Sequence, residues 1–396
     1  MKFSQRSENL EPSVTLAASA KAKQLKAQGV NVLSLTVGEP DFTTPVHIQK
    51  AAIEAIESGK ASFYTPSAGI PELRQAIVAY IKRYYGLDYK PAQTMVTDGA
   101  KFALYTAFQV LLDKGDEVII PVPYWVTYGE QVKLAEGTPV YVEGLEENDF
   151  KVTAEQLEEA TTANTKVLIL NSPSNPTGMI YNKKELAAIG EWAVKHDVLI
   201  ISDEIYGRLV YSNQEFVPIA TISEDIRKHT LIVNGVSKSY AMTGWRIGFV
   251  AGDEKLIKAM SDIASQSTSN PAAASQYAAV QALNGPQYSV EEMRLSFEQR
   301  MNTIYPLLTE IPGFKVSRPH GAFYFFPNVK DTMDMCGYQD VTKFCEDLLN
   351  EAHVAVVTGA GFGANENIRI SYATDLKTLL ETVRRIKAFV EKKRIK

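Results

Sequence analysis

The sequence contains little cysteine, no long basic block and no long apolar run. Only two of its 396 residues are cysteines, Cys336 and Cys345, which cannot make a disulfide framework and fit a reducing, cytoplasmic compartment. Lysine and arginine number 41 against 46 acidic residues, and the net charge of −5 makes nucleic acid and anionic membranes poor partners. No apolar run approaches the ~18 residues of a membrane span, and the first residues lack the apolar core of a signal peptide.

Histidine is also scarce, at five residues, and the histidines are scattered. No His-Glu-x-x-His or Cys-x-x-Cys motif occurs, so we expect no dedicated metal site. Apolar residues are plentiful, at 45%, and can supply a large core. The length predicts two or three units of ~150 residues each.

Short β-rich runs alternate with helical stretches from about residue 94 onward. These runs are 94–97, 117–120, 166–170, 198–202, 230–233 and 247–251. Several are continuously apolar, as expected for strands covered on both faces. The alternation predicts an α/β domain with a largely parallel sheet.

The last third of the chain has a different pattern. A long helical stretch at 289–308 precedes apolar strands at 322–326, 354–357 and 368–372, and a final helix begins at Leu376. We therefore expect a smaller α+β domain after the large one. The expected division is an N-terminal arm that packs on the small domain (1–40), a large domain (41–283) and a small domain (284–396).

Chemically active residues follow directly after the predicted strands. Because ligands of open α/β sheets bind at the carboxyl ends of the strands, we expect these residues to meet in one crevice. The groups are Gly99-Ala100-Lys101, Tyr124-Trp125, Asn171 to Gly178, Asp203 to Tyr206, and Ser237-Lys238.

Each group also has an ordinary structural interpretation. Residues 99–101 can form a tight strand-to-helix turn, although free amides at a helix start also suit a phosphate. Trp125 taken alone favours a core position, and Asp203 can cap the next segment. A lone lysine such as Lys238 most often lies on the surface. Arg246 can make a structural ion pair, and its planar fork also suits a phosphate.

Four motifs, in order, resemble those of a known family. They are Asn171-Ser-Pro-Ser-Asn175-Pro-Thr-Gly, Ser202-Asp203-Glu204-Ile-Tyr206, Ser237-Lys238-Ser-Tyr-Ala-Met-Thr-Gly-Trp-Arg246-Ile-Gly and Asn367-Ile-Arg369-Ile-Ser-Tyr. The chain resembles fold type I pyridoxal-phosphate (PLP) enzymes of the class I/II aminotransferase family, in the bacterial aspartate aminotransferase branch, over essentially its whole length. The resemblance implies the fold of that group, a PLP cofactor, and exchange of an amino group between an L-amino acid and a 2-oxo acid.

The resemblance also implies a role for each matching residue. Lys238 would form the Schiff base with the cofactor aldehyde and later carry the proton at the substrate Cα. Asp203 would keep the pyridine nitrogen protonated, and Tyr206 would donate to the phenolic oxygen of the ring. Asn175 would contact that oxygen and the substrate carboxylate, and Trp125 would lie on the ring face.

The cofactor phosphate would be held by the backbone amides of Gly99, Ala100 and Lys101, with Arg246 as its charged partner. Some relatives place a phosphate-binding serine three residues before the lysine. That position is a glycine here, and we expect Ser237 to take the role.

Tyr64 matches a family tyrosine that reaches the cofactor phosphate of the neighbouring subunit. The resemblance therefore implies a homodimer with shared active sites. The alternative is a loop tyrosine near Pro66 and Gly69 with no such role.

The substrate would be bound at both ends. Arg369 would grip the α-carboxylate in a bidentate pair, and Gly38 would let the backbone approach it closely. Lys101 would read the distal carboxylate of aspartate or glutamate, since residues 265–271 offer no arginine for that task. The alternatives are a Lys101 that points to solvent with an aromatic or prephenate-type substrate, and a fold type I PLP lyase that shares the same lysine, aspartate and arginine.

Two other classes are rejected. Residues 359–364 satisfy Gly-x-Gly-x-x-Ala, but only three residues separate them from the next strand, and the dinucleotide fingerprint needs a helix there. A PLP-sensing transcription regulator would need a DNA-binding helix-turn-helix ahead of residue 14 and a basic surface, and we expect neither.

Overall fold

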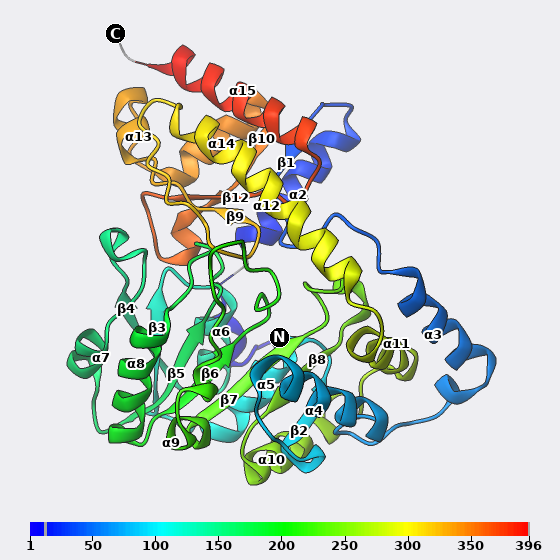
Figure 1. Ribbon diagram of the computed structural model, residues 1–396. Helices are drawn as coiled ribbons and strands as arrows, with labels where there is room; N and C mark the ends of the chain where they lie inside the picture. The colour runs from blue at the N-terminus through cyan, green and yellow to red at the C-terminus, as the bar shows by residue number, and fades with distance from the viewer. Residues whose placement is uncertain (12–13, 395–396) are drawn as a thin grey trace.

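A seven-stranded sheet forms the centre of the fold (Figure 1). In the computed structural model, which describes residues 1–11 and 14–394, the strand order is β2-β8-β7-β6-β5-β3-β4. The strands are β2 (Thr94–Thr97), β3 (Glu117–Val122), β4 (Thr138–Glu143), β5 (Thr165–Asn171), β6 (Leu199–Asp203), β7 (Thr230–Gly235) and β8 (Gly248–Ala251). Only β8 runs against its neighbours β2 and β7, so the predicted largely parallel sheet is confirmed.

The edge strand β4 was not predicted from the sequence. Most of its side chains are exposed or half-buried, whereas those of the other edge strand, β2, are all buried. It therefore lacks the continuous apolar run that marks the central strands.

Helices cover both faces of the sheet, because successive strand residues point to opposite sides. Val118 and Ile120 of β3 pack with one helix group, whereas Ile119 packs with the other. The first group is α5 (Ala100–Leu111), α6 (Thr127–Leu134) and α10 (Glu254–Ser265). The second group is α4 (Pro71–Tyr85), α7 (Ala154–Ala160), α8 (Lys183–His196), α9 (Glu224–Lys228) and α11 (Ala273–Asn284), with α3 (Val46–Glu57) packed on α11.

Two small sheets join the ends of the chain. One pairs β1 (Leu33–Ser34) with β10 (Val354–Ala355), and the other has β12 (Ile368–Ser371) between β11 (Val357–Thr358) and β9 (Tyr324–Phe325). The helices around them are α2 (Val14–Ala27), α12 (Tyr288–Thr309), α13 (Lys330–Cys336), α14 (Val341–Ala352) and α15 (Leu376–Lys393). A short helix, α1 (Gln5–Glu8), precedes α2 near the N-terminus. The β1–β10 pairing ties the N-terminal segment to the C-terminal part, while the domain boundaries at residues 40 and 283 stay a prediction.

Strand β9 is shorter than predicted from the apolar run 322–326. Ala322 has a φ of 57°, in the left-handed region that interrupts a strand, and Pro327 follows the run. None of the helices within the described ranges is long and apolar enough to cross a membrane.

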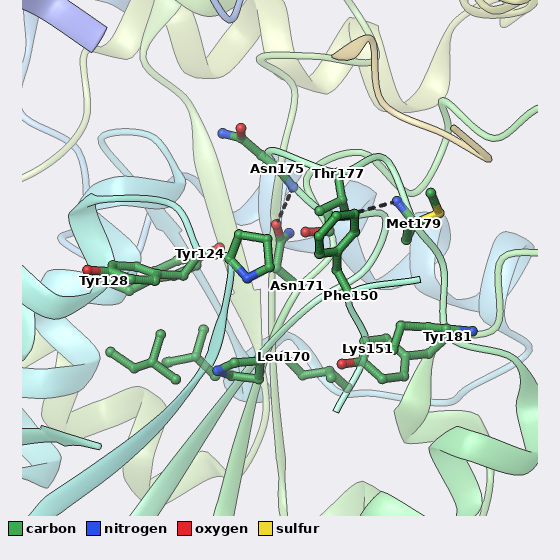
Figure 2. Close-up of a pocket in the computed structure, with 15 residues that line it drawn as sticks. Tyr124, Tyr128, Phe150, Lys151, Leu170, Asn171, Asn175, Thr177, Met179 and Tyr181 are labelled. Carbon is green, nitrogen blue, oxygen red and sulfur yellow. Dashed lines mark hydrogen bonds between the residues drawn. The ribbon is translucent and has the colours of Figure 1, made fainter. Parts of the chain in front are cut away.

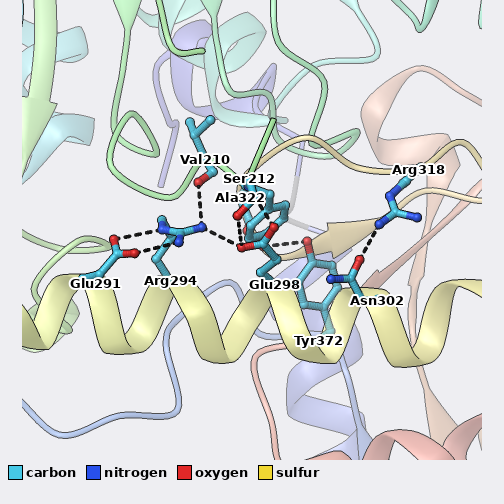
Figure 3. Close-up of polar contacts among 10 residues, drawn as sticks. Val210, Ser212, Glu291, Arg294, Glu298, Asn302, Arg318, Ala322 and Tyr372 are labelled. Atoms are coloured by element: carbon cyan, nitrogen blue, oxygen red, sulfur yellow. Dashed lines mark hydrogen bonds and ion pairs between the residues drawn. The ribbon is translucent and has the colours of Figure 1, made fainter. Parts of the chain in front are cut away.

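Helix α12 runs between the large sheet and the small ones, and it is anchored to the chain after Tyr206 (Figures 1 and 3). Arg294 donates to the carbonyl of Val210 at 3.3 Å and to Glu298 at 2.7 Å. The Glu298 carboxylate accepts from the amide and hydroxyl of Ser212 at 2.8 and 2.9 Å. These bonds fix the segment that carries Tyr206 to the helix that leads into the small sheets.

Candidate active site

A cavity of about 290 Å³ lies at the carboxyl ends of the parallel strands. Its volume approaches the range typical of small-molecule sites. The lining brings together eleven residues predicted from the sequence, namely Gly38, Ala100, Lys101, Trp125, Asn175, Asp203, Tyr206, Ser237, Lys238, Arg246 and Arg369. Tyr64 lies outside this cavity and is 92% exposed. In the described ranges, no group of three or more His, Cys, Asp or Glu is placed to hold a metal ion.

Asp203 is a buried carboxylate at the last position of β6. One oxygen accepts a hydrogen bond from the Tyr128 hydroxyl at 2.7 Å, and the other accepts from the Ile205 amide at 3.3 Å. Burial raises the pKa of Asp203, because its charged form loses water, while the hydrogen bonds from Tyr128 and Ile205 and the charge of Lys238 oppose that rise. A buried carboxylate of this kind needs a positively charged partner to offset its lost hydration. A protonated ring nitrogen bound in the cavity would supply that charge.

Lys238 follows β7 and projects into the same cavity. Its Nζ donates to the carbonyl of Gly38, which belongs to the segment after β1. Desolvation lowers the pKa of Lys238 to about 8, an effect that the Glu39 carboxylate partly offsets. Near neutral pH a useful fraction of this amine is therefore unprotonated, which is the form that attacks a carbonyl.

An anion site is built where α5 begins. No side chain caps the helix, and Gly99, just before it, has a φ of 81°. A Cβ at Gly99 would lie 2.2 Å from Nη2 of Arg246, so glycine is required for the guanidinium to approach the helix start. Arg246 is held by the Thr243 carbonyl at 2.9 Å. Free amides and a guanidinium together suit a phosphate.

Arg369, on β12, is a second guanidinium of the lining and is 2% exposed. Its Nη1 donates to the Asn175 side chain at 2.9 Å and its Nη2 to the Thr36 carbonyl at 2.7 Å. Its Nε is buried and finds no partner within the described ranges. A substrate carboxylate would satisfy this guanidinium, whose N–H groups favour bidentate pairing.

Asn175 is held in place by its own loop (Figure 2). Its amide donates to the Asn171 side chain at 2.8 Å, and further along the loop the Met179 amide donates to Thr177 at 3.2 Å. The side chain of Asn175 is thereby left to bond Arg369. The cavity of about 30 Å³ below this loop is too small for a substrate and has room for little more than a water molecule.

Lys101 and Trp125 meet at another part of the lining. The Lys101 Nζ lies 4.9 Å from the centre of the Trp125 ring, within range of a cation–π contact. The lysine side chain is exposed and lines the cavity as well, so it can meet a ligand without large movement.

Six further lining residues were not given a role from the sequence. They are Thr127, Tyr128, Asn171, Ile205, Thr243 and Tyr324. Tyr128 lies in the first turn of α6, three positions after Trp125, and its closeness in sequence to that predicted site residue could have indicated it. Tyr324 belongs to a different sheet, so local sequence gives no signal for it.

The class that this fold and cavity define is established by comparison with known proteins. The profile of the family described as aminotransferase class I and II matches residues 30–386. The chain belongs to this family, as its four motifs predicted.

Individual relatives and a solved structure are similar to this chain and belong to the same class. The asparagine–oxo-acid transaminase of Streptococcus mutans is 59% identical over 391 residues, covering 99% of this chain and all of that one. The aspartate aminotransferase of Bacillus subtilis is 56% identical over 392 residues, with the same coverage. The solved aspartate aminotransferase of Rhizobium meliloti is similar with a TM-score of 0.95 and 41% identity, over 99% of both chains. The protein is therefore an aminotransferase, which exchanges an amino group between an amino acid and a 2-oxo acid.

We expect Lys238, in protein free of any ligand, to react with acetic anhydride in proportion to its neutral fraction. With a pKa of about 8, the rate should rise about tenfold per pH unit below that value and level off above it. Pulse labelling against a free model amine, resolved by peptide mass spectrometry, measures the profile. A rate that still climbs tenfold between about pH 9 and 10 would contradict the low pKa.

Proposed function

We propose that this aminotransferase uses PLP and takes aspartate as amino donor with a 2-oxo acid as acceptor. One observation carries the proposal: Lys238, Asp203 and Arg369 share one cavity, and each bonds only neutral groups of the described chain. A PLP molecule and a substrate carboxylate offer the partners that these three groups lack.

The residues present fit PLP, which supplies an electron sink for the bonds at the substrate Cα. Asp203 would pair with the ring nitrogen, Trp125 would cover a ring face, and Tyr206 and Asn175 would bond the ring oxygen. The phosphate would lie against the start of α5. Its ligands would be the amides of Ala100 and Lys101, the Ser237 hydroxyl and the Arg246 guanidinium. The Gly99 amide, which the sequence also suggested, already donates to the Thr97 carbonyl at 2.8 Å.

Lys238 would bond to the cofactor aldehyde when no substrate is present. Once freed by substrate, its amine would remove the Cα proton and return it elsewhere, as a general base and then a general acid. The low pKa supports this role, because a base with a pKa near the working pH combines availability with driving force.

Arg369 would bind the α-carboxylate and Lys101 the distal carboxylate of the donor. A structure described as the Thermus thermophilus aspartate aminotransferase with maleate, a dicarboxylate, is 42% identical with a TM-score of 0.93, over 98% of this chain and 99% of that one. That likeness favours a dicarboxylic substrate. The name of the Streptococcus mutans relative makes asparagine the second candidate donor.

We also propose a cytoplasmic homodimer with shared active sites. The two cysteines are free thiols, in line with a reducing compartment. Tyr64 and Phe63 are 92% and 77% exposed, beside an α3 that exposes three apolar side chains. These are Val46, Ile53 and Ile56. An exposed apolar surface of this kind is typical of a protein interface, and a second copy would bring Tyr64 to its partner's cofactor phosphate.

The proposed reaction is tested directly by loading the purified protein with PLP. We expect aspartate and 2-oxoglutarate to give oxaloacetate and glutamate, followed by NMR. Lys238→Ala should lower kcat by at least ~10³-fold, because it loses both the covalent link and the proton carrier. Consumption of aspartate without formation of glutamate would instead identify a lyase, and aromatic donors in the same panel test the prephenate-type alternative.

We expect Lys101→Ala to lower kcat/KM for aspartate by about 10- to 100-fold, the loss of one charge-assisted contact. Asparagine and aromatic donors, which lack the distal carboxylate, should change by less than about threefold. Arg369→Ala is the comparison variant and should impair every donor. If aspartate turnover stays unchanged in Lys101→Ala while Arg369→Ala abolishes it, the lysine assignment fails.

A shared site predicts complementation between two inactive variants. Co-expressed Lys238→Ala and Tyr64→Ala chains should recover about a quarter of wild-type activity, since half of the dimers are hybrids with one intact site each. Lys238→Ala with Asp203→Ala is the matched control and should recover nothing, because both defects stay within one subunit's own site. Equal activity in the two mixtures would exclude a site shared through Tyr64.

A further inference from the structure

Tyr324 is a fully buried tyrosine in the cavity that no motif pointed to. It begins β9, the strand paired with β12, which carries Arg369. Its hydroxyl lies 2.9 Å from the hydroxyl of Tyr206, and the Arg369 guanidinium carbon lies 4.5 Å from the centre of its ring. One side chain therefore contacts both the cofactor half and the substrate half of the site.

The hydroxyls of Tyr206 and Tyr324 each have one proton to donate. Burial raises the pKa of both Tyr206 and Tyr324, so both phenols keep their single proton near neutral pH. Within the described ranges, the Tyr324 hydroxyl has no other hydrogen-bond partner than Tyr206. If Tyr206 donates to the ring oxygen of the cofactor, it cannot also donate to Tyr324. The bond between them must then run from Tyr324 to Tyr206.

We propose that Tyr324 is a positioning residue that donates to Tyr206 and so directs the Tyr206 proton onto the cofactor ring oxygen. This inference rests on the PLP site proposed above. A phenol that accepts a hydrogen bond becomes a stronger donor, so Tyr324 also strengthens the contact that Tyr206 makes. The ring oxygen is thereby held as a better-stabilised anion.

Gly38 leaves room for the Tyr324 hydroxyl because it has no side chain. A Cβ at Gly38 would lie 2.5 Å from the Tyr324 oxygen, so a side chain at position 38 would displace the phenol. The Gly38 carbonyl also accepts the hydrogen bond of Lys238. Glycine at position 38 therefore has a structural role, making room for the Tyr324 hydroxyl, in addition to the access to the substrate carboxylate that the sequence predicted.

The test is a pH titration of the visible absorption of PLP-loaded protein. A donor to the ring oxygen stabilises the form in which the cofactor-bound nitrogen has lost its proton, and so lowers the pKa of that nitrogen. Tyr324→Phe should therefore shift the titration upward by about 0.3 to 1 pH unit, because it weakens that donor. KM should change by less than about twofold, since the phenyl ring still stacks under Arg369, while kcat falls.

A double-variant cycle shows whether Tyr324 acts through Tyr206. Tyr206→Phe should shift the titration upward on its own, and adding Tyr324→Phe to it should give no further shift. Shifts that add would overturn the proposal, as would an unchanged titration in Tyr324→Phe.

The matched control is Tyr372→Phe. Tyr372, which Figure 3 labels, is also fully buried and pairs its hydroxyl with that of Tyr211 at 2.8 Å. It is not among the residues that line the cavity. Its removal should leave the titration unchanged, and an equal shift there would make the Tyr324 effect a general packing effect. A wild-type protein that takes up no PLP refutes the proposed function, whereas a coloured wild type with no Tyr324 effect refutes this inference alone.

Discussion

The hydrogen bond from Tyr128 to the Asp203 carboxylate shows the constraint on which the site depends. The carboxylate is removed from water at the end of β6 and is oriented by neutral donors, and within the described ranges no cation is hydrogen-bonded to it. Neutral donors fix its direction but do not repay the loss of hydration. Arg369 is in the same condition, bonded to an amide oxygen and a carbonyl. The fold holds these charges in place and leaves their compensation to the molecules that bind.

The site is assembled from two parts of the chain that are far apart in sequence. Asp203 and Lys238 follow strands of the large sheet, whereas Arg369 and Tyr324 belong to a small sheet near the C-terminus. The Lys238 bond to the Gly38 carbonyl and the Tyr206–Tyr324 pair cross between these parts. The Arg294–Glu298 network is a further connection, from α12 to the segment of Val210 and Ser212 (Figure 3). A change in the relative placement of the two parts would therefore reach the lysine and the phenol together.

Much of this arrangement could be predicted from the sequence, because buried parallel strands are continuously apolar and the residues after them share one edge. Strand β2 was predicted with its observed limits, Thr94 to Thr97. The edge strand β4 was missed since its exposure breaks that pattern, and β9 was predicted too long because the φ of Ala322 is not visible in a string of letters.

Within the cavity, residues that stand in motifs beside strands could be predicted, whereas a residue placed by tertiary packing could not. Lys238, Asp203 and Asn175 stand in motifs next to strands, and they line the cavity as expected. Tyr324 stands in no such motif, and its place depends on β9 packing across from Tyr206. A contact between distant segments is set by tertiary packing, which local patterns do not encode. The role predicted for Tyr64 stays a prediction, since it requires a second chain.

The closeness of Gly38 to the Tyr324 oxygen also limits the order in which these two positions of this chain can change without strain. With the phenol present, alanine at position 38 meets an atom 2.5 Å away; the next nearest atom, the ring carbon that bears the hydroxyl, is 3.6 Å away. A history in which position 324 first becomes phenylalanine thus opens position 38 to alanine, and the reverse order passes through a strained intermediate. In this chain a single oxygen atom makes the side chain tolerated at position 38 depend on the residue at position 324.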